Sequence, residues 1–311
     1  MTTVTLGNEI VVNNAGALTI NGLGANVLTI NGNAGNDRIF YTNQATVTVS
    51  GLTLTGGNGE GVNFRGYGGA IYANGGSLTL DRVYIVSNSA EVYGGGVDFR
   101  GGSHRINNST FSANTAFFCG GINNYGATPG AASTLIVVNS TISGNTAPDS
   151  IEGDGGGICN GGDTTLRNVT ITGNSSAGSF GGSGGLVNYA GGNLDLGNTI
   201  VAGNPGFSFD SDITNYDGVI TSAGGNLVGY SDVGQLLGAL QNNGGTTPTH
   251  ALLAGSPAID NGLNALVVDL PGGNTSLMTD QRGFVRIVGS AVDIGAFEFR
   301  SAKSRKRIRF F

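Results

Sequence analysis

The nonapeptide NSTISGNTA, residues 139–147, decides the fold of this chain, because close copies of it recur along the sequence. The copies are NSTFSANTA (108–116), NVTITGNSS (168–176) and NTIVAGNPG (198–206). Aligned on the last asparagine, the repeats are spaced by 26 to 31 residues and give one polar column: Asn88, Asn114, Asn145, Asn174 and Asn204. Three residues earlier they give one apolar column: Ile85, Phe111, Ile142, Ile171 and Val201. A period of about 20 to 50 residues is typical of stacked supersecondary units.

A second signature, glycines followed by an apolar residue, runs through the same region. It reads GGAI (68–71), GGGV (94–97), CGGI (119–122), GGGI (155–158) and GSGGL (182–186). Between the two signatures lies a further strand-like segment, such as SLTL (77–80) or NLDL (193–196). Each period therefore holds three short strands and no helix. This pattern predicts the coils of an all-β solenoid, in which equivalent strands of neighbouring coils pair in parallel.

Both columns have a mechanical explanation in such a solenoid. The apolar column becomes a buried ladder through which neighbouring coils share one core. Each asparagine tolerates the left-handed backbone of a tight corner, and its side-chain amide can bond to the next coil. We therefore expect a structural role, and not a ligand-binding one, for the five asparagines.

Charge is unevenly distributed along the chain. Of the 311 residues, 58 are glycine and only 11% are charged, with 20 acidic against 14 basic side chains. Six of the basic residues lie in a tail at 300–311: Arg300, Lys303, Arg305, Lys306, Arg307 and Arg309. The rest of the chain should repel nucleic acid, which binds through arrays of Lys and Arg. The tail itself either contacts an anionic surface or is a solvated terminus.

The sequence predicts no membrane span and contains no recognisable export signal. The N-terminal segment MTTVTLGNEI (1–10) has neither the basic nor the apolar part of a leader. Either a leader is missing from this sequence, or export uses another route, or the protein stays inside. Because VTLGNEIVV (4–12) is already strand-like, we expect an open edge on the first coil, which either continues a missing segment or stacks on another subunit.

The two cysteines occupy different points of the repeat. Cys119 lies three residues before the apolar Ile122, whereas Cys159 lies one residue after Ile158. They need not face each other, so we expect buried free thiols, with a disulfide as the alternative.

The repeat also resembles a known architecture. The glycine signature, the strands and the phrase that follows resemble the right-handed parallel β-helix repeats of bacterial surface proteins, including the polymorphic outer-membrane type, with the shape of the pectin-lyase-like superfamily. The segments NNGGTTPTHALLAGSPAIDNG (242–262), TDQRGFVR (279–286) and VDIGAFEF (292–299) closely resemble the end of bacterial choice-of-anchor Q proteins. The resemblance spans roughly residues 4–299. It implies a right-handed parallel β-helix that is extracellular or on the cell surface.

Three regions follow from the pattern. We expect a parallel β-helix with three-strand coils over 1–230, an irregular C-terminal cap over 231–299 and the basic tail over 300–311. The end of a solenoid exposes unpaired strands, so the middle region is expected to close the stack. Within it, DVGQLLGAL (232–240) predicts a helix.

Residues for catalysis are scarce. Hydrolases of the pectin-lyase-like shape carry Asn-Thr-Asp, Asp-Asp, Gly-His-Gly and Arg-Ile-Lys motifs, and this sequence has none of them. Its richest acidic cluster, APDSIEGDGGG (147–157), interrupts the repeat, and such loops are where a β-helix is expected to bind sugars. The weak catalytic candidates are Asp149, Glu152 and Asp154 of this insertion, together with Asp98.

No cofactor is expected. The segment DSDITNYDG (210–218) begins like a calcium loop but lacks the glutamate that would complete it, so a structural calcium ion is only an alternative.

Two hypotheses of different class remain. The first is a non-enzymatic β-solenoid of the bacterial cell surface or matrix with a structural, adhesive or self-assembling (filament) role, whose partners are a second copy, through the N-terminal coil, or a polysaccharide. The alternative is a secreted polysaccharide lyase or glycoside hydrolase.

Overall fold

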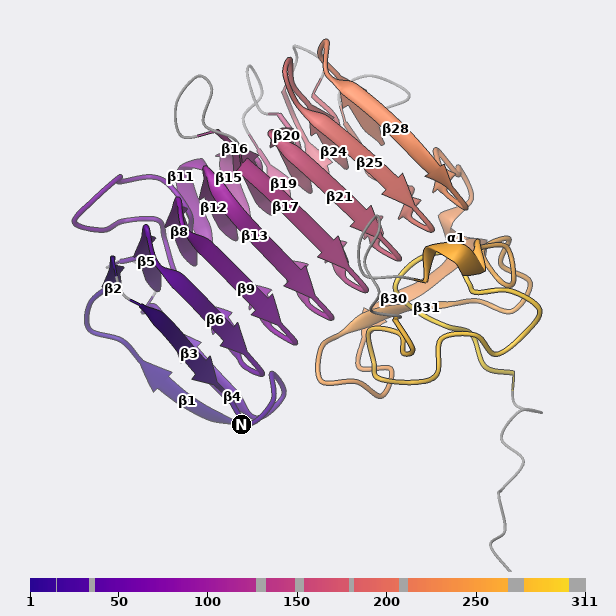
Figure 1. The fold of residues 1–311 in the computed structure, drawn as a ribbon, viewed down its shortest axis with the longest axis horizontal. Coiled ribbons are helices and arrows are strands. Elements are labelled where there is room, and N and C mark those ends of the chain that lie inside the picture. Colours follow the sequence, from indigo (N-terminus) through magenta and orange to yellow (C-terminus); the bar gives the residue numbers. More distant parts are fainter. Residues whose placement is uncertain are drawn as a thin grey trace, which may run out of the picture.

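The computed structural model describes residues 1–14, 16–33, 37–126, 133–148, 154–178, 182–206, 212–267 and 277–301. Parallel sheets stack into a β-solenoid of about seven turns (Figure 1). The all-β parallel β-helix that the repeat predicted is therefore confirmed.

Three long sheets, here called A, B and C, run the length of the stack. Sheet A contains β1 (Thr2–Thr5), β4 (Leu28–Asn31), β7 (Thr53–Thr55), β10 (Tyr84–Val86), β14 (Thr110–Ser112), β18 (Thr141–Ser143), β22 (Thr170–Thr172), β26 (Ile200–Val201) and β29 (Leu227–Val228). Sheet B contains β2 (Ile10–Asn13), β5 (Phe40–Asn43), β8 (Ile71–Asn74), β12 (Val97–Arg100), β16 (Ile122–Tyr125), β20 (Ile158–Gly161), β24 (Leu186–Asn188) and β27 (Ile213–Asn215). Sheet C contains β3 (Ala17–Asn21), β6 (Thr46–Ser50), β9 (Ser77–Asp81), β13 (Gly102–Asn107), β17 (Ser133–Val138), β21 (Asp163–Arg167), β25 (Asn193–Gly197) and β28 (Val219–Gly224).

A fourth, short sheet adds to the three strands expected per coil. Sheet D contains β11 (Ser89–Tyr93), β15 (Thr115–Phe118), β19 (Thr146–Ala147) and β23 (Ser175–Ser176). The phrase NSTISGNTA thus holds two strands, β18 and β19, joined through Gly144, whose φ of 68° turns the chain. Strands β19 and β23 have only two residues each, which is too few to show alternation in the sequence.

The apolar column is a continuous ladder inside the stack. Its members pair in register from coil to coil in sheet A, and each is fully buried: Ile85, Phe111, Ile142, Ile171 and Val201. Burying each such side chain contributes about 1.5 to 3 kcal/mol. Because sheets B and C supply similar ladders to the same cluster, one core holds all the coils together.

The asparagine column forms a second buried ladder. Nδ2 of each asparagine donates to Oδ1 of the next, at 3.0 Å for Asn88 to Asn114 and 2.8 Å for Asn114 to Asn145. Further along, Asn204 donates at 2.7 Å to the Asp212 carboxylate. Each Nδ2 also donates to a backbone carbonyl, as Asn145 does to Phe111 at 3.1 Å. Both amide protons are therefore paired, which buried donors require.

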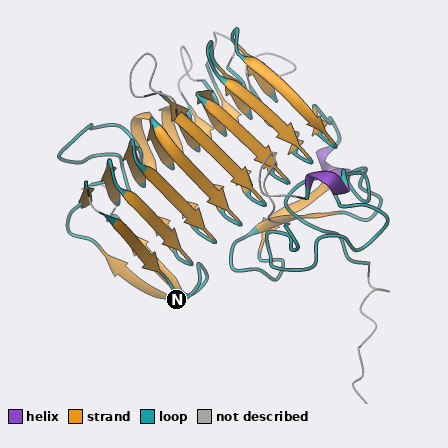
Figure 2. Ribbon diagram, in the orientation of Figure 1, coloured by secondary structure: helices purple, strands orange, loops and turns teal. Residues whose placement is uncertain are grey.

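The C-terminal region lies beside the stack, against the outer face of sheet A (Figure 2). It contains α1 (Val233–Leu236), β30 (Leu237–Gln241), β31 (Thr249–Leu252) and the 3-10 helix η1 (Asn264–Leu266). The threonine side chains of β14, β18 and β22 bond to it: Thr110 to the Pro248 carbonyl, Thr141 to Gln281 and Thr170 to the Ala296 amide.

The helix expected at 232–240 is only four residues long. Its second half became β30 because Leu237–Gln241 pairs with β31 in an antiparallel hairpin, a tertiary contact that overrides local helix propensity. Among the described residues, no helix has the length and hydropathy to cross a membrane.

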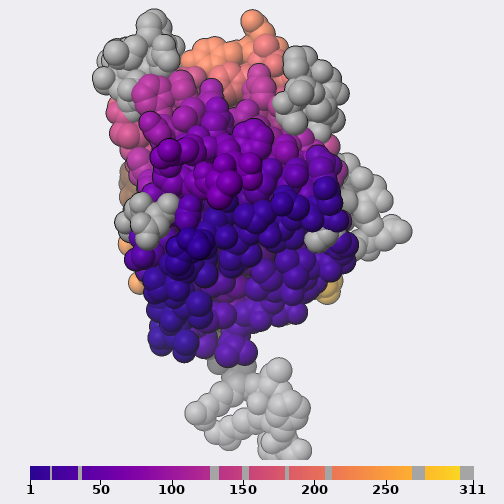
Figure 3. Space-filling view, turned by 90° about the vertical axis from the view of Figure 1, so that its left-hand side faces the viewer, coloured from indigo at the N-terminus to yellow at the C-terminus, as the bar shows by residue number. Residues whose placement is uncertain are grey.

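Both ends of the stack carry exposed strands. Strand β1 is exposed along its whole length, and Figure 3 looks onto this end, with the first coils in indigo. At the other end Ile220 is 40% exposed, although its in-register neighbour Leu194 is buried. Self-association through the N-terminal coil stays a prediction.

Candidate functional site

The outer face of sheet B carries a different side chain at each coil. Side chains alternate between the two faces of a strand, so the residue after each core position points outward. The outward residues of five neighbouring strands stand in register: Tyr72, Asp98, Asn123, Cys159 and Val187. Their neighbours in the core are all aliphatic: Ile71, Val97, Ile122, Ile158 and Leu186. The outward positions therefore differ from coil to coil, whereas the inward positions keep an aliphatic residue in each coil.

The glycine signature builds one wall over this face. In three coils its first residue is a left-handed glycine, with φ of 61° at Gly68, 64° at Gly94 and 58° at Gly155, a backbone that glycine adopts without a Cβ penalty. The residues before these corners, and before Cys119, stack as an aromatic wall: Tyr67, Tyr93 and Phe118. Ring centroids are 5.8 Å apart for the first pair and 4.9 Å for the second. Asp154, which precedes Gly155, extends the wall into the next coil.

Arg100 and Tyr125 stand on the opposite side. They end β12 and β16 and pair in register. Nε of Arg100 donates to both carboxylate oxygens of Asp98, at 3.0 and 3.2 Å, and its guanidinium carbon lies 4.9 Å from the centre of the Tyr93 ring. Within the part of the chain that the structure describes, the buried Nη2 of Arg100 has no hydrogen-bond partner. A buried N–H group without an acceptor is costly.

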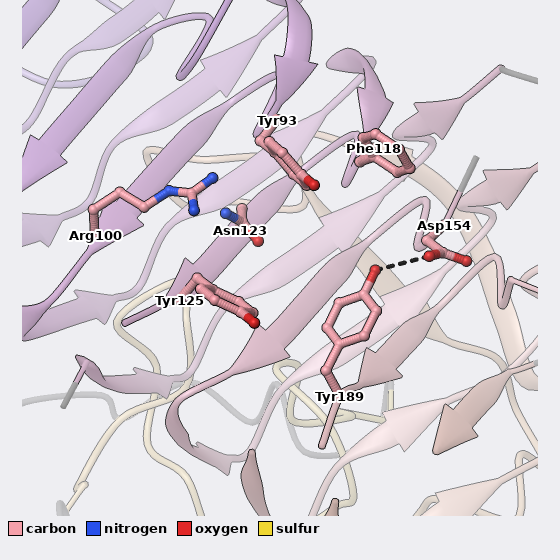
Figure 4. A pocket seen from close by; sticks show the side chains of 7 residues that line it. All are labelled: Tyr93, Arg100, Phe118, Asn123, Tyr125, Asp154 and Tyr189. Carbon is pink, nitrogen blue, oxygen red and sulfur yellow. Dashed lines mark hydrogen bonds between the residues drawn. The ribbon is translucent and has the colours of Figure 1, made fainter. Parts of the chain in front are cut away.

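The two walls enclose a pocket of about 290 Å³ (Figure 4). Its lining consists of Tyr93, Arg100, Phe118, Asn123, Tyr125, Asp154 and Tyr189. The four aromatic residues offer apolar ring surface, while the other three offer a cation, an amide and a carboxylate. The hydroxyl of Tyr189 donates to Oδ2 of Asp154 at 2.9 Å. A concave apolar surface with a few convergent polar groups is typical of ligand sites.

Asp98 and Asp154 have different environments. Asp98 is completely buried, and Asn123 donates to it at 2.7 Å in addition to Arg100. Burial raises the pKa of Asp98, and the charge of Arg100 opposes that rise. Burial, with the nearby Asp154 carboxylate, also raises the pKa of Tyr189, so its hydroxyl stays protonated and keeps its bond to Asp154. Asp98 therefore positions Arg100, and Asp154 is the carboxylate that lines the pocket.

The structure places two of the four acidic candidates on this face, Asp98 beneath Arg100 and Asp154 in the wall. Asp149 and Glu152 lie outside the described residues.

The expectation of free thiols is wrong, because Cys119 and Cys159 form a disulfide with a Cα–Cα distance of 5.5 Å. Cys119 occupies the corner that is Gly68, Gly94 or Gly155 in three other coils, and it has the same left-handed backbone, with φ of 60°. The corner turns the chain back over its own strand, so Cys119 reaches the outward position that Cys159 occupies in the next coil. The positions of the two cysteines relative to Ile122 and Ile158 did not reveal that the chain folds back at this corner. The disulfide packs against Val187 beneath Tyr93, Phe118 and Tyr189.

Sequence reasoning missed the aromatic residues of the pocket. A usable signal was present, since aligning the glycine signatures one residue earlier gives Tyr67, Tyr93, Phe118 and Asp154 in one column. Tyr125 and Tyr189 lie two residues after the outward residues Asn123 and Val187, and no repeated pattern in the sequence singles them out.

At its N-terminal end the outer face is filled by the chain itself. Phe64 stacks on Tyr72 with ring centroids 4.9 Å apart. Beneath them, Arg38 is completely buried, pairs with Glu9 at 3.0 Å and donates to the carbonyls of Gly59 and Phe64. These contacts cover the outer face of sheet B on the N-terminal side of the pocket.

Neither histidine belongs to the pocket. His104 is inside the core, stacked on Phe99 at 4.3 Å, and His250 joins Ser143 to the Gly238 carbonyl. The described residues contain no cluster of three or more His, Cys, Asp or Glu side chains that could hold a metal ion.

Comparison with known proteins adds no relative: no family model matches the chain, and no curated protein or solved structure is significantly similar to it. The resemblance to choice-of-anchor Q proteins and to the pectin-lyase-like superfamily stays a prediction.

Proposed function

We propose that this protein is an extracytoplasmic β-solenoid that binds a polysaccharide in the pocket on the outer face of sheet B. The observation that carries the proposal is the lining itself. Four aromatic side chains, the Arg100 side chain and a carboxylate line one concavity. The C–H faces of sugar rings pack on aromatic surface, and their hydroxyl groups need donors and acceptors at the rim. The proposed role is adhesive, with the β-helix as the rigid support.

The disulfide supports the extracytoplasmic part of the proposal. Cys119 and Cys159 account for all the cysteine in the chain, and both are oxidised. Disulfides persist in secreted and cell-surface proteins and are rare where thiols are kept reduced. The bacterial origin and the family resemblance rest on the sequence motifs alone.

The test is affinity electrophoresis of the purified chain through gels that contain soluble neutral or acidic polysaccharides, with Tyr125→Ala as the variant. Tyr125 is exposed at the pocket, so its loss should weaken binding by about ten-fold or more with little change in stability. Tyr84→Ala is the matched control, because Tyr84 lies on sheet A, away from the pocket. Binding that both variants weaken equally, or no binding to any of the polymers, would count against the proposal.

Cleavage of the bound polymer is the second candidate function, favoured by one observation: Asp154 presents a carboxylate in the pocket. Glycoside hydrolysis ordinarily needs two carboxyl groups that reach the substrate, and Asp98 is buried behind Arg100. Incubating each polymer with the wild type and with Asp154→Asn, and following new reducing ends and unsaturated products, separates the two. Cleavage by the wild type alone would favour the enzyme, and binding without cleavage would favour the adhesive role.

A further inference from the structure

The charges at the pocket on the outer face of sheet B bear on which polysaccharides it accepts. Arg100 is the one cationic side chain among the described residues that line the pocket, and Asp154 is the one carboxylate among them. A further carboxylate, Asp98, lies beneath Arg100 and pairs with it. One cation and two carboxylates leave one net negative charge at the site.

The charge of Arg100 is matched by Asp98. Nε of Arg100 donates to both carboxylate oxygens, at 3.0 and 3.2 Å, and the Asp98 side chain is completely buried. Asn123 is turned to the same carboxylate, because its Nδ2 donates to Asp98 at 2.7 Å. The guanidinium carbon also lies 4.9 Å from the centre of the Tyr93 ring and 5.7 Å from that of Tyr125. The pocket's arginine and its amide are therefore directed at Asp98, and not at an acidic group of a ligand.

Asp154 adds a negative charge in the wall of the pocket. The hydroxyl of Tyr189 donates to its Oδ2 at 2.9 Å (Figure 4). Burial, together with the charge of Asp154, raises the pKa of Tyr189, so the hydroxyl keeps its proton and the carboxylate keeps its charge. The hydroxyl groups of a neutral sugar donate to oxygen atoms of this kind. A uronate ring would instead bring a second carboxylate toward Asp154.

We propose that the pocket takes neutral sugar residues and that Asp154 excludes uronates, an inference that rests on the polysaccharide binding proposed above. Like charges repel more strongly where a ligand has displaced water. Such repulsion is a common way to reject a wrong ligand. An acidic polymer would favour a pocket whose arginine presents its N–H groups to the ligand in pairs, and here a buried carboxylate takes that place.

The experiment is isothermal titration calorimetry of the full chain at low ionic strength, where charge effects are least screened. The probes are a soluble glucan, a mannan and a galactan, each compared with a derivative whose C6 hydroxyl groups are oxidised to carboxylates. Asp154→Asn removes the charge in the pocket and keeps an oxygen that accepts the Tyr189 hydroxyl. Asp232→Asn is the matched control, because it removes the same charge from an exposed position just before α1. Circular dichroism checks that the variants are folded.

Tyr125→Ala identifies the part of the binding that uses the pocket. The chain carries six basic residues at 300–311, and these attract any polyanion. Binding of an oxidised polymer therefore counts only to the extent that Tyr125→Ala weakens it.

The wild type should bind an oxidised polymer through the pocket about ten-fold more weakly than its neutral parent. Asp154→Asn should recover most of this difference and leave binding of the neutral polymer within about two-fold, and Asp232→Asn should change neither. Equal pocket binding of both members of a pair, or no gain for the oxidised polymer in Asp154→Asn, would overturn the inference and leave the proposed function standing. Binding of no polymer, or binding that Tyr125→Ala does not weaken, would refute the proposed function itself and this inference with it.

Discussion

The interior and the exterior of sheet B are one residue apart on the same strands, and they follow opposite rules. Inward positions are aliphatic in five successive strands, whereas the outward positions next to them hold a tyrosine, an aspartate, an asparagine, a cysteine and a valine. An interior ladder needs the same shape at each coil because each side chain packs on its equivalents above and below. The exterior has no such constraint, so variation there reflects what the face contacts.

The outer face of sheet A shows that an exterior can also be uniform. Its threonines at 110, 141 and 170 repeat because the C-terminal region bonds to each of them. These three outward threonines of sheet A therefore serve an internal contact. The outward positions of sheet B beneath the pocket differ from coil to coil.

The largest expected effect tests the interior ladder. Asn145→Ala should lower the free energy of unfolding by about 3 to 5 kcal/mol, because the buried amide of Asn114 and the Phe111 carbonyl would lose their partners. Urea denaturation measures the change. Asn193→Ala, at an exposed asparagine of β25, is the control and should cost less than about 1 kcal/mol. Equal costs for both would mean that the ladder does not stabilise the stack.

The next effect tests the exterior. Replacing both Cys119 and Cys159 by serine should lower the free energy of unfolding by about 3 kcal/mol, because the bond closes a loop with a sequence separation of 40 residues. Reductant should destabilise the wild type and leave the variant unchanged in the same denaturation experiment. Glycine at position 119 should recover about 1 kcal/mol relative to serine, since the corner is left-handed. If the variants with glycine and with serine at position 119 have the same free energy of unfolding, this account of the corner is wrong.

The smallest effect concerns the one interior position where the core ladder of sheet C carries a histidine. His104 aligns with Leu135 in the next coil, and its Nδ1 accepts the Leu78 amide at 3.2 Å. Burial lowers the pKa of His104 from 6.5 to about 4. The unfolded chain takes up this proton first, so the stability contributed by neutral His104 is complete above pH 6.5 and is lost as the pH falls toward 4.

The wild type should therefore lose about 2 kcal/mol of unfolding free energy by pH 5 through His104. Burial raises the pKa values of Asp98 and Glu298, and these groups act in the opposite direction in both proteins. The difference between wild type and His104→Leu, measured by denaturation at pH 7 and pH 5, isolates the histidine. A difference that does not change with pH would rule out this role for His104.

The sequence by itself determined the coil. The recurring phrase fixed where the strands of sheet A lie, which side chains enter the core and which asparagines face the next coil, because in a solenoid all these relations are repeated locally. Two of the acidic residues that the sequence singled out, Asp98 and Asp154, lie on the face that carries the pocket.

Tertiary structure decided the rest. The fold-back at the corner brought Cys119 to Cys159, a contact between neighbouring coils that the positions of the two cysteines in the repeat did not indicate. The same corners place Tyr93 and Phe118 over the outer face of sheet B, where their rings stack. The C-terminal region docked against the side of the stack, with the expected helix at 232–240 giving way to a hairpin. Such outcomes depend on contacts between segments far apart in sequence, and their energies outweigh the local preferences that a sequence pattern records.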